Sequence, residues 1–150
     1  MDIERLHNNL VELHWELIHE GFLNDHYMTL RGLETEPGSL SNTMETYLKS
    51  CFENILQLSY LTDEEPVDMR RVYRVIFRIK GGSSCIGAAR MVTASQTLLT
   101  SRRTVDNRER VMQLLDNLQD EYSLLRDKLD ALFTIERQII HAVGRVRRWW

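Results

Sequence analysis

The chain has 150 residues, of which 43% are hydrophobic and 27% are charged, and its formal net charge is -3 at pH 7. This composition is typical of a folded protein and excludes a disordered or fibrous one, so we expect a single domain over residues 1–150. No run approaches the roughly 20 apolar residues of a membrane span, and the first residues lack the layout of a secretory signal, so we expect no membrane contact and no export.

The first half of the chain predicts three helices. The first carries apolar residues three and four apart and stops near Gly21. A short second helix is capped by Asn24 or Asp25 and ends in the loop 36–39. The third begins at Ser41, with Glu45 near the offset of a capping box, and runs to about Leu61.

The second half predicts three more helices. After a turn at 62–66, a fourth helix turns Met69, Val72, Val75, Ile76 and Ile79 inward and continues into the glycine-rich segment 81–87. A fifth follows at 88–99, and a long sixth starts at Asp106. Its apolar seam is Val111, Leu115, Leu118, Tyr122, Leu125, Leu129 and Leu132. Continuous helical periodicity with short connections predicts an all-α antiparallel bundle of about six helices.

Charge and cysteine usage add two expectations. Through Pro66 there are three basic and thirteen acidic residues, and after it sixteen basic and nine acidic ones. The positive second half suits an acidic partner, although the two halves can also complement each other within the fold. Cys51 and Cys85 lie inside helical patterns without paired spacing, which predicts buried thiols in a reducing compartment rather than a disulfide or metal site.

The segment 77–87 reads Phe-Arg-Ile-Lys-Gly-Gly-Ser-Ser-Cys-Ile-Gly. It closely resembles the signature of histidine phosphotransfer proteins, His-Gln-x-Lys-Gly-Ser-Ser-x-Ser-Ile-Gly. In this register Lys80, Gly81, Ser83, Ile86 and Gly87 match specified residues, and Ser84 stands at a variable position. The departures are Phe77, Arg78, Gly82 and Cys85. The helix order and the Gly-Phe-Leu-Asn-Asp turn at 21–25 also resemble the plant family. The resemblance implies a four-helix bundle with two additional N-terminal helices.

In that family an exposed imidazole takes a phosphoryl group from the aspartyl phosphate of one receiver domain and passes it to another. Phe77 stands at the imidazole's position and has no nucleophilic nitrogen, so transfer through this residue is excluded. The resemblance therefore implies a pseudo-phosphotransfer protein that is not an enzyme. It would bind receiver domains of sensor histidine kinases and response regulators, compete with true phosphotransfer proteins, and act as a negative regulator. In plants this implies the cytokinin pathway, in cytoplasm and nucleus.

The docking face follows from helical geometry. At about 100° per residue Phe77 lies nearly opposite the core residue Ile79, so it should be exposed. The predicted partner-binding residues are Tyr73, Arg74, Phe77, Arg78, Lys80, Gly81, Gly82 and Ser84. Lys80 resembles the family's lysine that screens phosphoryl charge. The glycine pair either leaves room for a partner loop or marks a helix end or a tight helix crossing.

Several alternatives stay open. An active mediator could use another histidine, and the candidates are His7, His14, His19, His26 and His141, which we expect at the surface or an interface rather than on a metal. A scaffold that no longer binds receivers is the second alternative, because Arg78 and Gly82 depart from the signature. We expect no cofactor, no metal and a monomer. The basic and aromatic segment at about 144–150 is expected to be a flexible or edge-packed tail rather than a nucleic-acid or membrane contact.

Overall fold

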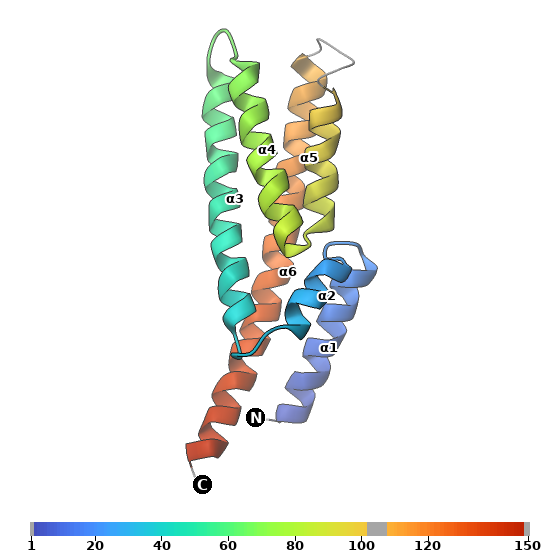
Figure 1. Ribbon diagram of the computed structural model, residues 1–150, viewed down its shortest axis with the longest axis vertical. Helices are drawn as coiled ribbons and strands as arrows, with labels where there is room; N and C mark the ends of the chain where they lie inside the picture. Colours follow the sequence, from blue (N-terminus) through green and yellow to red (C-terminus); the bar gives the residue numbers. More distant parts are fainter. Residues whose placement is uncertain (1, 102–107, 149–150) are drawn as a thin grey trace.

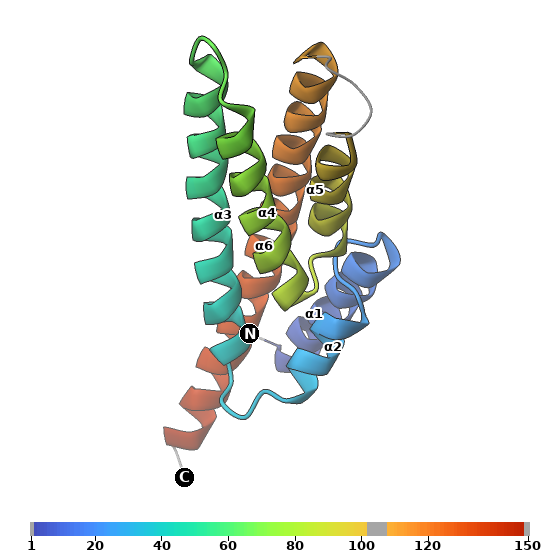
Figure 2. The same ribbon diagram turned by 45° about the horizontal axis from the view of Figure 1, so that its top comes forward.

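The computed structural model describes residues 2–101 and 108–148, with side chains described as far as residue 144. Within these ranges every regular element is a helix: α1 (Ile3–His19), α2 (Asp25–Gly32), α3 (Ser39–Asp63), α4 (Met69–Ile86), α5 (Ala89–Ser101) and α6 (Arg108–Arg148). Figure 1 shows α3 to α6 running up and down as a bundle, with α1 and α2 together beside its lower part, and Figure 2 shows the same grouping from another side. The predicted all-α bundle with two additional N-terminal helices is confirmed.

Helix α6 is long enough to contact both the α3–α6 bundle and the N-terminal helix α1. Its 41 residues span about 60 Å at the helical rise of about 1.5 Å per residue. It packs against α5 within the bundle and against α1 beside it. The whole predicted seam from Val111 to Leu132 is buried, as the spacing of its apolar residues predicts.

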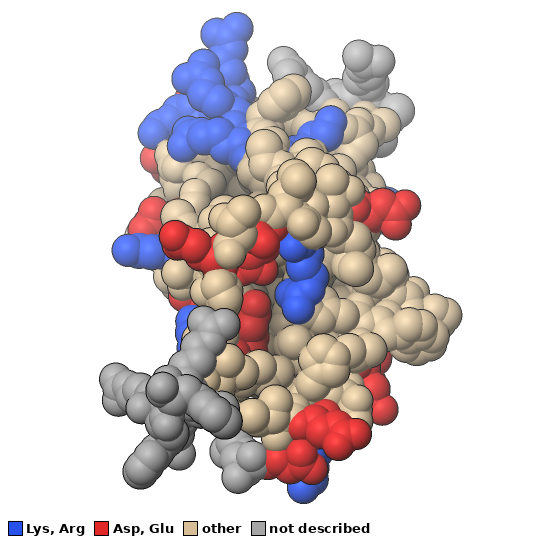
Figure 3. All heavy atoms as spheres, turned by 60° about the horizontal axis from the view of Figure 1, so that its bottom comes forward, with Lys and Arg blue, Asp and Glu red and all other residues tan. Residues whose placement is uncertain are grey.

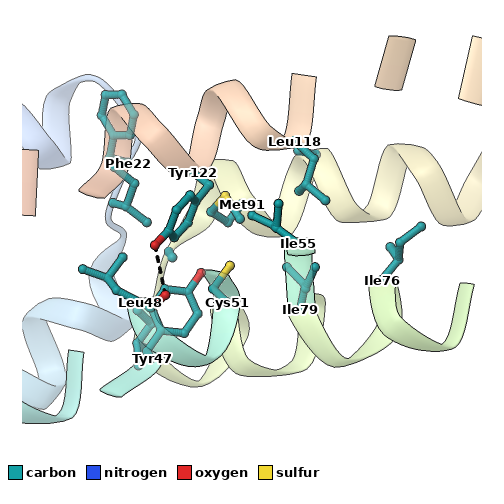
Figure 4. Packing of buried hydrophobic residues seen from close by; sticks show 14 of the residues in the cluster. Phe22, Tyr47, Leu48, Cys51, Ile55, Ile76, Ile79, Met91, Leu118 and Tyr122 are labelled. Carbon is teal, nitrogen blue, oxygen red and sulfur yellow. Dashed lines mark hydrogen bonds between the residues drawn. The ribbon is translucent and has the colours of Figure 1, made fainter. Parts of the chain in front are cut away.

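One continuous apolar core receives side chains from all six helices. In Figure 4 the buried residues of α3 and α4, such as Ile55 and Ile79, point toward Met91 of α5 and Leu118 of α6. The burial of these apolar side chains is the main favourable contribution to folding. The α4 face opposite this core is left free for other roles.

The turn between α1 and α2 fixes the end of α4. Phe22 and Leu23 are buried, the Asn24 amide donates to the Gly87 carbonyl at 3.0 Å, and the Ala89 amide donates to the Phe22 carbonyl at 3.0 Å. Gly87 has φ 78°, and a Cβ on it would lie 2.5 Å from Asn24 Oδ1. The left-handed backbone and the close approach both require glycine here.

Cations cover the same turn from outside. The Arg90 guanidinium lies 4.1 Å and the Lys128 ammonium 5.3 Å from the centre of the Phe22 ring. Arg90 also donates two hydrogen bonds to Glu121, at 2.7 and 2.8 Å. These contacts tie the α1–α2 turn to α5 and α6.

The start of α3 differs from the prediction. The helix begins at Ser39, after Gly38 with φ 88°. Its first turn is capped from outside the helix by the Glu34 carboxylate, which accepts from the Leu40 amide at 3.2 Å. Ser41 lies inside the helix, where its hydroxyl donates to Glu136, and Glu45 pairs with Arg137. The predicted capping box is therefore wrong, because both side chains bind α6 instead.

Two further expectations need correction. Cys51 is buried, and burial raises the pKa of its thiol to about 12, but Cys85 is exposed on the outer face of α4. The segment predicted as a tail is helical through Arg148, while the rest of that segment and the predicted helix start at Asp106 lie outside the described residues. No helix in the described ranges has both the length and the apolar character needed to cross a bilayer.

Candidate partner-binding site

The core-facing side chains of α4 determine which of its residues face solvent. The Asp68 carboxylate caps the helix by accepting from the Arg71 amide at 3.3 Å. Val72, Ile76 and Ile79 are almost fully buried, so residues on the opposite side of the helix face solvent. Phe77 is 64% exposed, as its spacing from Ile79 predicts.

Lys80 lies one turn after Phe77 and covers its ring. The ammonium nitrogen is 5.8 Å from the ring centre, which is at the outer limit of a cation–π contact. The exposed aromatic ring thus has a positive charge beside it.

A shallow groove runs along α4 on the N-terminal side of Phe77. It is lined by Arg70, Tyr73, Arg74, Phe77 and Arg78. The helix carries five basic residues and no acidic one. Figure 3 shows basic side chains gathered at the upper left of the face in view. The groove is therefore electropositive and partly aromatic.

The structure separates the predicted site residues into exposed and packed ones. Exposed are Arg74, Phe77, Arg78, Gly81 and Ser84, and Lys80 is half-buried. Tyr73 is only 8% exposed and belongs to the core, although it also lines the groove. The expectation that it shares the exposed face is wrong, because it lies beside the buried Val72 and Ile76 at the border of the two faces.

The two glycines have different surroundings. A Cβ on Gly81 would meet nothing within 4 Å, so this position is open to an approaching group. A Cβ on Gly82 would lie 3.7 Å from the Tyr47 ring, so Gly82 belongs to the crossing of α3 and α4. Gly81 therefore fits the expectation of room for a partner loop, and Gly82 fits that of a tight helix crossing.

Buried polar contacts join α3 to α4 and to α6. The Tyr47 hydroxyl lies 2.6 Å from Ser83 Oγ, and the Tyr122 hydroxyl donates to the Leu48 carbonyl at 3.1 Å (Figure 4). Burial raises the pKa of Tyr47 and of Tyr122, so both hydroxyls remain protonated at neutral pH. The Tyr47–Ser83 contact thus joins α4 to α3 beneath the predicted partner-binding face.

Two of the five histidines make specific polar contacts. His14 is buried, with Nδ1 3.0 Å from the Leu10 carbonyl and Nε2 2.9 Å from the Tyr27 hydroxyl. The expected surface or interface position is therefore wrong for this histidine. His26 is exposed and lies with Nε2 2.9 Å from the Cys85 carbonyl at the end of α4. Within the described ranges no group of three or more His, Cys, Asp or Glu could hold a metal ion.

Sequence reasoning missed Arg70 as part of the groove, and it missed the Tyr47–Ser83 contact. Arg70 could have been found, since it lies four residues before Arg74 and eight before Arg78. The Tyr47–Ser83 contact joins residues 36 positions apart and has no local signal.

Fold and site together define a helical-bundle protein with one basic, aromatic helix face exposed to solvent. The chain is 30% identical over 135 residues to histidine-containing phosphotransfer protein 5 of Arabidopsis thaliana, covering 87% of this chain and 84% of the relative. The chain belongs to the family of histidine-containing phosphotransfer proteins. No family model matches it.

Two more similarities support this assignment. Pseudo histidine-containing phosphotransfer protein 6 of Arabidopsis thaliana is 26% identical over 147 residues, which is 96% of this chain and 95% of the relative. The solved histidine-containing phosphotransfer protein of Medicago truncatula has a TM-score of 0.83 and 25% identity, covering 91% of this chain and 94% of that one. Both histidine-containing and pseudo members are thus among its relatives.

Proposed function

We propose that this chain is a pseudo-histidine phosphotransfer protein, which binds receiver domains without accepting phosphate. The observation that carries the proposal is the exposed Phe77 beside Lys80 and the open Gly81, in the register of the family signature. A phenyl ring offers no lone pair for in-line attack on a phosphoryl group. The surrounding face keeps the open backbone and the cations that suit an acidic partner.

The partners we propose are the receiver domains of sensor histidine kinases and response regulators, bound by a monomer of this chain. Occupying a receiver excludes an active phosphotransfer protein from the same surface, so the chain acts as a competitive negative regulator. In plants, the role we propose is in the cytokinin phosphorelay, in cytoplasm and nucleus.

Calorimetry with a plant receiver domain tests the proposal. We expect a 1:1 complex with a micromolar dissociation constant, or about -8 kcal/mol of binding free energy. In a reconstituted relay, the chain should slow phosphate transfer to an active family member. Absence of binding to every receiver in a panel would overturn the proposal and favour a scaffold that no longer docks.

A charge reversal locates the interface. Lys80→Glu should weaken the complex and reduce its salt sensitivity, because it replaces attraction to the receiver's acidic pocket by repulsion. Lys49→Glu is the matched control, since Lys49 is exposed on α3, outside the proposed face. Equal effects of the two substitutions would place the interface elsewhere.

A further inference from the structure

The arrangement of the groove's arginines lowers the stability of α4. Arg70, Arg74 and Arg78 follow one another at four-residue spacing, so each lies about 6 Å along the axis from the next. Like charges at this spacing destabilise a helix, and cations near its N-terminus oppose the helix dipole. Between Met69 and Ile86 the helix has no acidic residue to relieve them, and the Asp68 carboxylate at its N-cap accepts from the Arg71 amide.

These side chains also have no carboxylate partner within the described ranges. Each ion pair found there involves other cations, for example Arg90 with Glu121 at 2.7 Å and Arg71 with Glu64 at 4.0 Å. Arg70, Arg74 and Arg78 are all exposed. Their charges are therefore free to meet an external anion.

The lining of the groove favours a phosphoryl group over carboxylates. Its remaining walls are the rings of Tyr73 and Phe77, and Lys80 lies over the Phe77 ring. Guanidinium groups bind phosphoryl oxygens through two parallel hydrogen bonds, and a phosphoryl group brings a charge of about -2 near neutral pH. An acidic pocket that carries a phosphoryl group therefore matches this groove better than carboxylates alone.

We propose that Arg74 and Arg78, with Arg70 behind them, bind the phosphoryl group of a phosphorylated receiver domain, so that the chain prefers the phosphorylated over the unphosphorylated form. This inference rests on the proposed receiver binding. The phosphoryl group stays on the receiver, because Phe77 cannot accept it. The chain thereby occupies receivers that are ready to donate phosphate.

The experiment compares one receiver domain with and without beryllium trifluoride, a stable mimic of the phosphoryl group. By calorimetry, the chain should bind the beryllium trifluoride form about ten-fold more tightly. The double substitution Arg74→Gln with Arg78→Gln should make the two affinities equal. Arg71→Gln is the matched control, because Arg71 lies outside the groove and should leave the ratio unchanged. Circular dichroism of each variant verifies its fold.

The outcomes separate this inference from the proposed function. Equal binding of both receiver forms by the unaltered chain overturns the inference and leaves receiver binding intact. Binding of neither form overturns the proposed function itself. If the double variant still binds the beryllium trifluoride form more tightly, groups other than Arg74 and Arg78 recognise the phosphoryl charge, and the inference is overturned. The chain could instead bind double-stranded DNA more tightly than either receiver form. If the same double substitution abolished that DNA binding, the groove would be assigned to nucleic acid and the inference would be overturned as well.

Discussion

The ammonium of Lys80 lies 5.8 Å from the centre of the Phe77 ring, one turn earlier on the same exposed face of α4. A group placed at position 77 therefore has a cation beside it. A neighbouring positive charge disfavours the protonated form of an imidazole, so a histidine at this position should be a neutral nucleophile near pH 7. A histidine placed there would therefore be in the protonation state that phosphoryl acceptance requires.

Phe77→His tests that reading. Because Phe77 is exposed, the substitution should change the free energy of unfolding by no more than about 0.5 kcal/mol. The variant should accept phosphate slowly from a radiolabelled receiver, as acid-labile phosphohistidine. Phe77→His with Arg78→Gln should accept it faster. Arg78 stands where the family signature has glutamine, and a guanidinium that binds the phosphoryl group holds it on the receiver and slows its transfer.

The unaltered chain is the control for this transfer and should stay unlabelled. Acid-labile label on it would instead support an active mediator that uses another histidine. If the double variant binds the receiver and never becomes labelled, Phe77 does not occupy the phosphoacceptor position.

Two glycine substitutions on α4 should have opposite effects on stability. Gly81→Ala meets open space and removes conformational freedom from the unfolded chain, so it should stabilise the fold by about 0.5 to 1 kcal/mol. Gly87→Ala should destabilise it by at least about 2 kcal/mol, because its φ of 78° disfavours a side chain and the new Cβ would press on Asn24. Urea unfolding measures both, and a stable Gly87→Ala would refute the close packing of the α1–α2 turn on α4.

Residue spacing accounts for the features that depend on one helix at a time. It predicts the six helices, the α6 seam and the exposure of Phe77, because these follow from which side of a helix is apolar. It fails where a distant element decides: Ser41 bonds Glu136, 95 positions away, and His14 bonds Tyr27 of the next helix. At a border position such as Tyr73, a small rotation of the helix determines burial, and spacing alone does not fix that rotation.

His14 should make stability depend on pH. Burial, and then the charge of Arg31, lower the pKa of His14 from 6.5 to about 4, against the opposing effect of the Leu10 carbonyl. The folded state therefore binds this proton less readily than the unfolded state. The stability contributed by neutral His14 is fully present above about pH 7.5 and declines as the pH falls from about 6.5 to about 4, by about 3 kcal/mol in total.

The pH dependence is measured by urea unfolding between pH 4.5 and 7.5. His14→Gln should remove this part of the decline, because glutamine does not titrate. His7→Gln is the matched control on the same helix, since His7 is exposed, and it should leave the decline unchanged. A His14→Gln profile parallel to that of the unaltered chain would show that His14 does not cause the decline.

The contact between Tyr47 and Ser83 should be a coupled pair beneath the docking face. The two oxygens lie 2.6 Å apart and both residues are buried, so removing one hydroxyl leaves the other short of a partner. Tyr47→Phe and Ser83→Ala should each lower the free energy of unfolding by about 1 to 2 kcal/mol. The double variant should cost less than the sum of the two, with a coupling of about 1 kcal/mol, because no hydroxyl then remains buried without its partner. Urea unfolding of the four proteins closes this cycle, and strictly additive losses would show that the two hydroxyls do not stabilise each other.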